Sequence, residues 1–236
     1  MTTDRENQEF WAPEGRGGGR TSVVAVVGAA LLVAGLFCLG WVGYQLVGTD
    51  VVAQRSFEHG TQELHSQWAA EPAAGPKSTD SATPAAQRVP GSALALLRVP
   101  RFGDDFEVPV VAGTDLKDLS RGVGHYDKTA APGQVGNFAL AGHRITHGQP
   151  FAKLLTLRTG DRVVVETREA VFTYVMDSSP TDLTVKDTAG WVLDPVPEHP
   201  GAAPTRPLIT LTTCQDLFHS SDRSVGFGHL ERTQDK

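Results

Sequence analysis

Cysteine is scarce in this chain of 236 residues, which contains only Cys38 and Cys214. Cys38 lies inside a long apolar run that we assign to a membrane below, so the two thiols cannot pair. The sequence therefore excludes a disulfide framework, and no Cys-x2-Cys pair indicates a zinc site. The lone Cys214 is either a small buried hydrophobic side chain or a reactive group.

Basic residues are also in the minority. Lys and Arg number 21 against 27 Asp and Glu, which gives a formal net charge of −6. This balance gives no support to nucleic-acid binding. No glycine-rich loop follows a predicted strand and opens a helix, so a phosphate-binding loop is not indicated. We expect no metal site and no cofactor.

The N-terminal part of the chain is poor material for a folded core. Residues 1–21 are polar and glycine-rich, and we expect a disordered tail. Residues 22–48 predict a transmembrane helix, because Val23 to Val47 carries no charge and would extend about 37 Å as a helix, against a hydrocarbon core of about 30 Å. A secretory signal peptide is the competing interpretation, but the apolar run is too long for a typical one.

The charges that flank the apolar run predict its orientation. Arg16 and Arg20 precede it closely, whereas only Arg55 follows within a similar distance. Loops on the cytoplasmic side carry an excess of Lys and Arg. We therefore expect a cytoplasmic N-terminus and an extracellular location for everything after residue 50.

Residues 49–91 divide into two parts by composition. Val51 to Ala70 contains no proline and predicts a polar juxtamembrane helix, although Gly60 weakens the pattern. Glu71 to Gly91 is rich in Pro, Ala, Ser and Thr, which predicts a semi-extended linker. We expect this linker to hold a folded domain away from the membrane.

From Ser92 to Lys236 short apolar runs are separated by turn residues, and helical material is scarce. About seven or eight short strands indicate a single all-β domain, an antiparallel barrel or sandwich. Short helices are expected at Asp115 to Ser120 and at Pro150 to Leu155. The expected strands are Ala93 to Val99, Phe106 to Val111, Asn137 to Ala141, Arg162 to Thr167, Ala170 to Asp177, Leu208 to Thr213 and Ser224 to Leu230.

Three short motifs occur in this domain. Leu208 to Cys214 reads Leu-Ile-Thr-Leu-Thr-Thr-Cys, which predicts a strand that ends on the thiol. Its last five residues resemble the Thr-Leu-x-Thr-Cys signature of sortases, the membrane-anchored cysteine transpeptidases of Gram-positive bacteria. Leu140 to Arg144 upstream reads Leu-Ala-Gly-His-Arg, and Asp222 to Val225 downstream reads Asp-Arg-Ser-Val, in the order that the family requires. The resemblance covers Ser92 to Leu230, is nearest to class E, and implies a closed β-barrel of about eight strands.

The resemblance gives a role to three residues. Cys214 would be the nucleophile, and because an unperturbed thiol has a pKa of roughly 8.5 it needs a basic or cationic neighbour. His143, at the exit of the Asn137 to Ala141 strand, would be the general acid and base. Parallel pairing of this strand with the cysteine strand would bring the two side chains together. Arg223 would open the following strand and stabilise negative charge on the carbonyl oxygen.

Two further residues are expected near the substrate. Thr213, with the backbone near Cys214, would help to position it. His147 stands where class E members often have tyrosine, which is associated with choosing alanine rather than proline in the sorting signal, so the preferred signal stays open. We interpret His125 as structural. Calcium assists some sortases through a carboxylate cluster, and because no acidic run identifies one here, calcium stimulation also stays open.

The resemblance implies a function for the whole chain. It would cleave a C-terminal sorting signal, Leu-Pro-x-Thr-Gly or Leu-Ala-x-Thr-Gly, between Thr and Gly through a thioacyl-enzyme. It would then transfer the protein to an amine of a peptidoglycan precursor. Its partners would be secreted proteins that carry the signal, this amine and the membrane, with residues 92–236 as the extracellular catalytic domain. The alternatives are a cysteine hydrolase of another fold and an inactive membrane-tethered binding domain.

Overall fold

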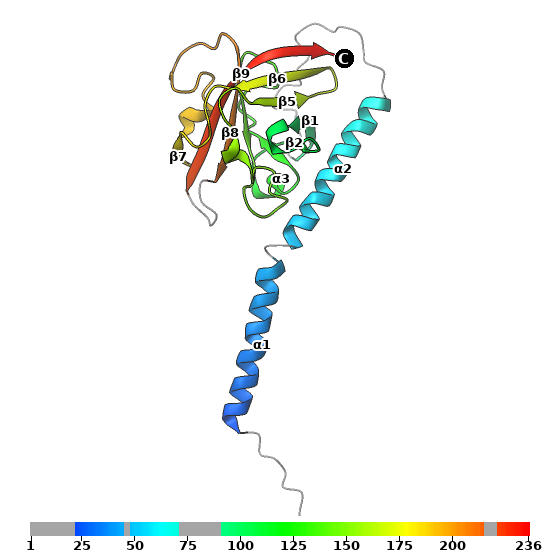
Figure 1. Cartoon of the computed structure of the whole chain (residues 1–236), viewed down its shortest axis with the longest axis vertical. Helices are drawn as coiled ribbons and strands as arrows, with labels where there is room; N and C mark the ends of the chain where they lie inside the picture. Colours follow the sequence, from blue (N-terminus) through cyan, green and yellow to red (C-terminus); the bar gives the residue numbers. More distant parts are fainter. Residues whose placement is uncertain (1–21, 45–47, 71–90, 215–220) are drawn as a thin grey trace, which may run out of the picture. The chain divides into compact units, whose positions relative to one another are not determined.

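The computed structural model describes residues 22–44, 48–70, 91–214 and 221–236 (Figure 1). The chain divides into two compact units, residues 1–42 and 43–236. The expected disordered tail (1–21) and the Pro-rich linker over residues 71–90 lie outside the described residues.

The apolar run forms helix α1 (Val23–Gly43), which contains no charged residue. Among the described residues it is the one helix long and apolar enough to cross a membrane, a test that an N-terminal signal sequence would also pass. The last part of the predicted span, residues 45–47, is outside the described residues.

Eight strands of the second unit form a closed mixed barrel, which confirms the fold class expected from the sequence. The strands follow one another in the order β6-β5-β1-β2-β3-β4-β8-β9, and pairing of β6 with β9 closes the ring. Two neighbouring pairs, β2–β3 and β4–β8, are parallel and the others are antiparallel. The barrel strands are β1 (Ala93–Arg98), β2 (Glu107–Ala112), β3 (Val123–His125), β4 (Gly136–Ala141), β5 (Arg162–Glu166), β6 (Ala170–Met176), β8 (Pro207–Cys214) and β9 (Asp222–Asp235).

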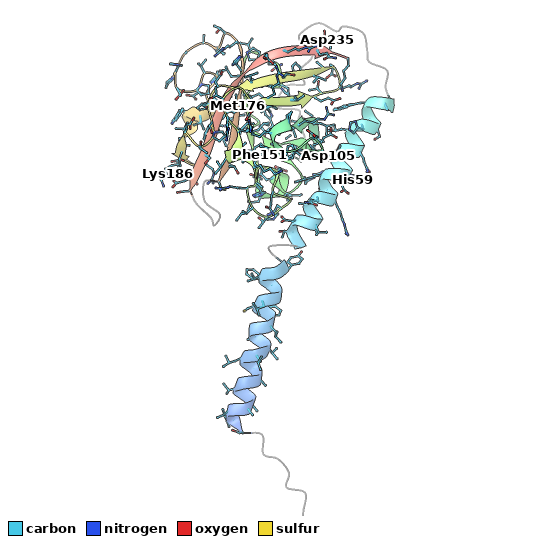
Figure 2. The ribbon with its side chains drawn as sticks, in the orientation of Figure 1. His59, Asp105, Phe151, Met176, Lys186 and Asp235 are labelled. Carbon is cyan, nitrogen blue, oxygen red and sulfur yellow. The ribbon has the colours of Figure 1, made fainter. Side chains whose placement is uncertain are left out.

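Strand β9 is longer than its apolar pattern predicts and holds two neighbours. Near its start it pairs with the additional strand β7 (Thr184–Lys186), and its far end, at Asp235, pairs with β6. Figure 2 shows Lys186 and Asp235 near opposite ends of β9. The polar end of β9 after Leu230 is a strand because its backbone groups are paired, although its side chains are exposed.

The structure contains two strands that the sequence did not predict and lacks one helix that it did. Strands β3 and β7 were not expected, because three-residue strands are too short to show an alternating pattern. The helix expected at Pro150 to Leu155 is wrong: turns there lead into the short 3-10 helix η4 (Leu154–Thr156). The helix expected at Asp115 to Ser120 is confirmed as a single turn, α3 (Leu116–Leu119). Two other 3-10 turns are η3 (Pro100–Phe102) and η5 (Gly190–Leu193).

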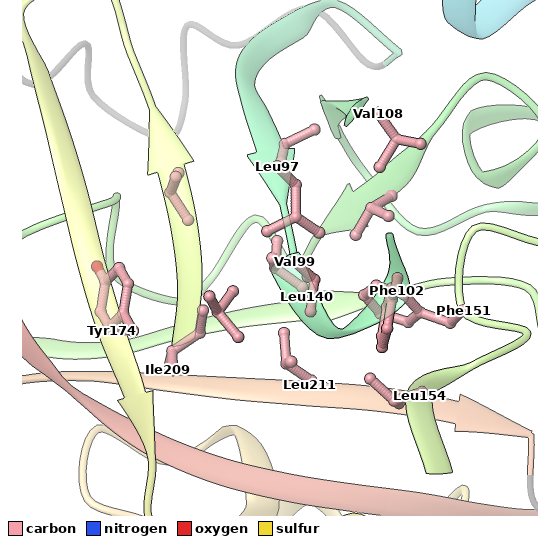
Figure 3. Close-up of a cluster of buried hydrophobic side chains, with 14 of the residues drawn as sticks. Leu97, Val99, Phe102, Val108, Leu140, Phe151, Leu154, Tyr174, Ile209 and Leu211 are labelled. Carbon is pink, nitrogen blue, oxygen red and sulfur yellow. The ribbon is translucent and has the colours of Figure 1, made fainter. Parts of the chain in front are cut away.

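The barrel interior is filled by alternate residues of the strands. Ile209 and Leu211 of β8 face Phe138 and Leu140 of β4, and all four are fully buried. Figure 3 shows Leu140, Ile209 and Leu211 in this core. The phenol of Tyr174 is also buried, and its oxygen accepts a hydrogen bond from the Gly133 N–H at 2.7 Å. Burial raises the pKa of this phenol.

Helix α2 (Thr49–Ala70) belongs to the same unit as the barrel and lies beside β1 and β2 (Figure 1). The sequence predicted the helix but not its docking. Ala53, Phe57 and Leu64 are its buried residues, and their spacing places them on one face. Near its far end, His65 Nε2 lies 3.3 Å from Glu107 Oε1. The ammonium of Lys236, at the end of the chain, lies 4.2 Å from the ring centroid of Trp68.

Phe138→Ala is expected to destabilise the barrel by about 3–5 kcal/mol, because it leaves a cavity beside Tyr174 in a closed core. The measurement is urea unfolding of the full chain in detergent micelles. Val135→Ala is the control, since that side chain is 56% exposed. A loss below about 1 kcal/mol for Phe138→Ala would contradict the packing described here.

Candidate active site

The parallel pairing of β4 and β8 brings the ends of two distant segments to one edge of the barrel. Ala141 is the register partner of Thr212, and the Gly142 N–H donates to the Thr212 carbonyl at 3.2 Å. His143 follows directly after this contact, and Cys214 is the last residue of β8. The expected parallel arrangement of the two strands is therefore confirmed.

Arg223 joins this edge through the next strand. In the antiparallel pairing of β8 with β9, Arg223 is the direct register partner of Cys214. Side chains of opposed residues lie on the same face, with Cβ atoms about 4.5–5.5 Å apart. The guanidinium Nη2 lies 3.7 Å from Asp187 Oδ2, and Nη1 donates to the Asp222 carbonyl at 3.1 Å. The guanidinium is therefore held by these two contacts, while the side chain remains 30% exposed to solvent.

His143 lies near the start of a loop with an unusual backbone, which we call the histidine loop (residues 142–150). Four successive residues have left-handed φ angles: Thr146 (61°), His147 (50°), Gly148 (78°) and Gln149 (49°). Each residue other than glycine costs roughly 1–3 kcal/mol in this region, so contacts elsewhere must hold the conformation. Sequence patterns gave no sign of it.

The imidazole of His143 is held in an environment that disfavours its charged form. Burial, and then the charge of His147, lower the pKa of His143 to about 4. The His147 ring stacks on it with 4.8 Å between centroids, and His147 Nδ1 lies 2.9 Å from Thr146 Oγ1. His143 Nε2 is buried and has no hydrogen-bond partner among the described residues. The lowered pKa therefore favours the neutral imidazole at neutral pH.

Thr213 lies on the opposite face of β8 from the thiol. It is in phase with the core residues Ile209 and Leu211 and is 2% exposed. Its hydroxyl donates to the Gly142 carbonyl at 2.8 Å, so it ties the end of β8 to the start of the histidine loop. Contact of Thr213 with a substrate stays a prediction.

The outer face of β4 and β8 is organised by residues that the sequence analysis did not single out. The Thr210 hydroxyl donates to Asn137 Oδ1 at 2.7 Å. Asn137 Nδ2 in turn donates to the carbonyls of Val192 and Asp194, both at 3.1 Å. These bonds hold the segment around η5 over the face that carries Cys214. An asparagine inside an apolar strand was the available signal, because this residue is depleted in strands.

His143 and His147 have the His-x3-His spacing of some zinc sites. Their loop is not helical, and no group of three or more His, Cys, Asp or Glu residues that could hold a metal ion occurs among the described residues. His125, which we interpreted as structural, is fully buried, and its Nε2 lies 2.9 Å from the Ala130 carbonyl oxygen.

Comparisons with known proteins give a consistent family. A model described as a sortase domain matches residues 97–231. Sortase SrtE1 of Streptomyces coelicolor is 38% identical over 224 residues, which cover 89% of this chain but only 58% of SrtE1. Sortase SrtE2 of the same organism is 32% identical over 252 residues, covering 99% of this chain and 94% of SrtE2.

Solved structures agree with these relatives. The structure of sortase E from Streptomyces avermitilis is 41% identical, with a TM-score of 0.56, and the match covers 62% of this chain and 93% of that one. A crystal structure of sortase E1 from S. coelicolor with a tripeptide in its active site is 39% identical, with a TM-score of 0.55, covering 63% and 93%.

His147→Ala is expected to raise the pKa of His143 above about 4, because the change removes both a neighbouring charge and a covering ring. NMR titration of the histidine resonances, assigned with His143→Ala, measures the shift. The exposed His59→Ala is the control. Because the pKa of folded His143 lies below its unfolded value of 6.5, the free energy of unfolding should fall as the pH drops from 6.5 towards 4. His147→Ala brings the two pKa values closer together, so this fall should be smaller in the variant. An unchanged pKa would contradict the described contact.

Proposed function

The chain belongs to the sortase family of cysteine transpeptidases, and we propose that it cleaves a sorting signal between Thr and Gly and transfers the acyl part to an amine. The observation that carries this proposal is the register at one barrel edge. Cys214 is opposed by Arg223 on β9, while parallel β4 delivers His143 beside the end of β8.

In the first proposed step, His143 takes the proton of the Cys214 thiol while Sγ attacks the threonine carbonyl carbon. The C–N bond to glycine then breaks, and His143 passes this proton to the departing amine, which leaves a thioester and a neutral imidazole. Arg223 donates to the oxygen that becomes negative in the transition state. In the second step the acceptor amine attacks the thioester carbon and gives a proton to His143, the C–S bond breaks, and His143 returns that proton to Cys214 Sγ.

The low pKa of His143 fits a group that must be neutral before the acceptor arrives. A neutral imidazole can take the proton of the incoming amine without first losing one of its own. Its Nε2, which has no hydrogen-bond partner in the described part of the chain, supports the same role. Hydrogen bonds between catalytic groups often form only when the substrate is bound.

The preferred signal depends on His147, which stacks on His143 and therefore lies next to the proposed general acid. We propose that this imidazole contacts the second residue of the signal, Pro or Ala, and that Thr213 acts mainly by holding Gly142. A panel of Leu-Pro-x-Thr-Gly and Leu-Ala-x-Thr-Gly peptides, assayed with wild type and His147→Tyr, would test the first point. Equal preference in both proteins would contradict it.

The proposed substrates and acceptor lie at a cell surface. We propose that α1 anchors the chain with its N-terminus in the cytoplasm, and that residues 92–236 form the extracellular catalytic domain. Secreted proteins that carry the signal and a peptidoglycan-precursor amine would be the two reactants. The absence of charge in α1 supports the anchor. Protease access from outside intact cells, with loss of the domain but not of an N-terminal tag, is the expected result for this topology.

Cys214→Ala is expected to abolish peptide cleavage, since no other thiol lies at the site, whereas Cys38→Ala retains it. The measurement is the mass of the products from a peptide of either signal type, incubated with the full chain in detergent. Cleavage by Cys214→Ala would overturn the proposed mechanism. A wild-type chain that cleaves neither peptide and whose Cys214 also resists alkylation would favour the inactive binding domain.

Arg223→Lys is expected to lower kcat/KM by about 100-fold, because lysine keeps the positive charge but loses the planar donor fork. Arg232→Lys is a matched control on the same strand, where the side chain is exposed and bonds to Gln234. If both variants were within about twofold of wild type, the oxyanion role would have to move to another donor.

A further inference from the structure

We infer that helix α2 is a positioning element of the active site, and that Asp50 acts through the backbone of the histidine loop to place His143. This inference deepens the proposed function and rests on it for the role of His143. It concerns a helix that lies outside the residues 97–231 matched by the family model.

The first observation is a pair of hydrogen bonds between segments about a hundred residues apart. The Asp50 carboxylate accepts from the Gly148 N–H at 2.9 Å through one oxygen and from the Gln149 side-chain amide through the other. Both donors lie among the four residues with left-handed backbone. A charged acceptor makes stronger bonds than a neutral one, so Asp50 stabilises a conformation that the loop sequence itself disfavours.

The second observation is apolar packing at the same point. A methyl group placed on Gly148 would lie 2.6 Å from the Phe57 ring and 3.2 Å from the Ala53 methyl. The loop backbone therefore approaches α2 as closely as its atoms allow. Phe57 is 6% exposed and Ala53 is 2% exposed. Together with Asp50, these two side chains contact one face of the histidine loop.

Beside this contact, a cavity of about 460 Å³ lies between α2 and the barrel, lined among others by Phe57, Phe102 and Gln149. Asp50 and Phe57 therefore hold the histidine loop at the edge of this cavity. At its C-terminal end the helix is held by His65, which contacts Glu107, and by Trp68, which contacts Lys236. These contacts help to fix the position of α2 and therefore of Asp50.

The loop transmits this placement to the reacting group. Gly148 is adjacent to His147, whose ring stacks on His143 at 4.8 Å. On the other side of the loop, the Phe151 N–H donates to the His143 carbonyl at 2.9 Å. If the left-handed turn relaxes, His147 and His143 move with it. A small displacement of a catalytic group can reduce a rate by one to two orders of magnitude.

The test compares four full-length proteins in detergent by single-turnover cleavage of a sorting peptide. Asp50→Ala is expected to be about tenfold slower than wild type. Asp50→Asn keeps an acceptor for the Gly148 N–H, and the Gln149 amide can turn its oxygen to the new amide, so this variant should stay within about threefold. Glu58→Ala removes the same charge from an exposed site on the same helix and should stay within about twofold.

The asparagine variant separates positioning from a general effect on the helix. Asp50 lies in the first turn of α2, where a negative charge favours the helix. If that charge were its function, Asp50→Asn would be as slow as Asp50→Ala, and this result would overturn the inference. A rate for Asp50→Ala equal to that of Glu58→Ala would also overturn it.

A second measurement needs no sorting peptide, and it separates failure of the proposed acyl transfer from failure of the positioning role of Asp50. The rate of Cys214 alkylation by iodoacetamide is measured in a Cys38→Ala background, with His143→Ala as the reference. Positioning predicts that Asp50→Ala shifts this rate in the same direction as His143→Ala, and that Asp50→Asn does not. If wild type cleaves neither peptide, the proposed function fails, while this alkylation pattern would still support positioning. If the alkylation and cleavage rates of Asp50→Ala both equalled those of wild type, the positioning role of Asp50 would be overturned.

Discussion

The parallel pairing of β4 with β8 is the constraint on which the site depends. Neighbouring parallel strands end at the same edge of a sheet, so His143 and Cys214, far apart in the sequence, lie at one edge of the barrel. The bond from Thr213 to Gly142 locks this edge, and β9 adds Arg223 opposite the thiol. Because side chains alternate along a strand, a slip of one residue in β8 would turn the thiol into the core.

The site combines a rigid wall with a strained loop. Cys214 and Arg223 stand on paired strands, whereas His143 stands on a loop whose backbone conformation is costly. A buried nitrogen without a partner is also costly, and among the residues that the structure describes none bonds to His143 Nε2. Both features disfavour the folded state and suit a group that must meet a substrate and exchange a proton. Helix α2 offsets the cost from outside the barrel through Asp50 and Phe57.

Much of this arrangement was predictable from local sequence. The apolar run of β4 and the β-branched run of β8 predicted strands with functional residues at their ends, and the order of the three motifs indicated the family and the barrel. Strands β3 and β7 were not predicted, because three residues are too few to show an alternation of apolar and polar side chains. The left-handed turn and the docking of α2 were not predicted for a different reason. They depend on contacts such as Asp50 with Gly148, and a local sequence pattern does not indicate a partner so distant in the chain.

The central claim is that this barrel edge performs acyl transfer through a thioester on Cys214. The most direct measurement is the intact mass of the full chain after mixing with a sorting peptide in the absence of an acceptor amine, followed by mapping of the modified residue. The account predicts an added mass equal to the peptide segment that ends at threonine, located on Cys214. A chain that cleaves the peptide while carrying the adduct on another residue, or on none under conditions that trap thioesters, would contradict it.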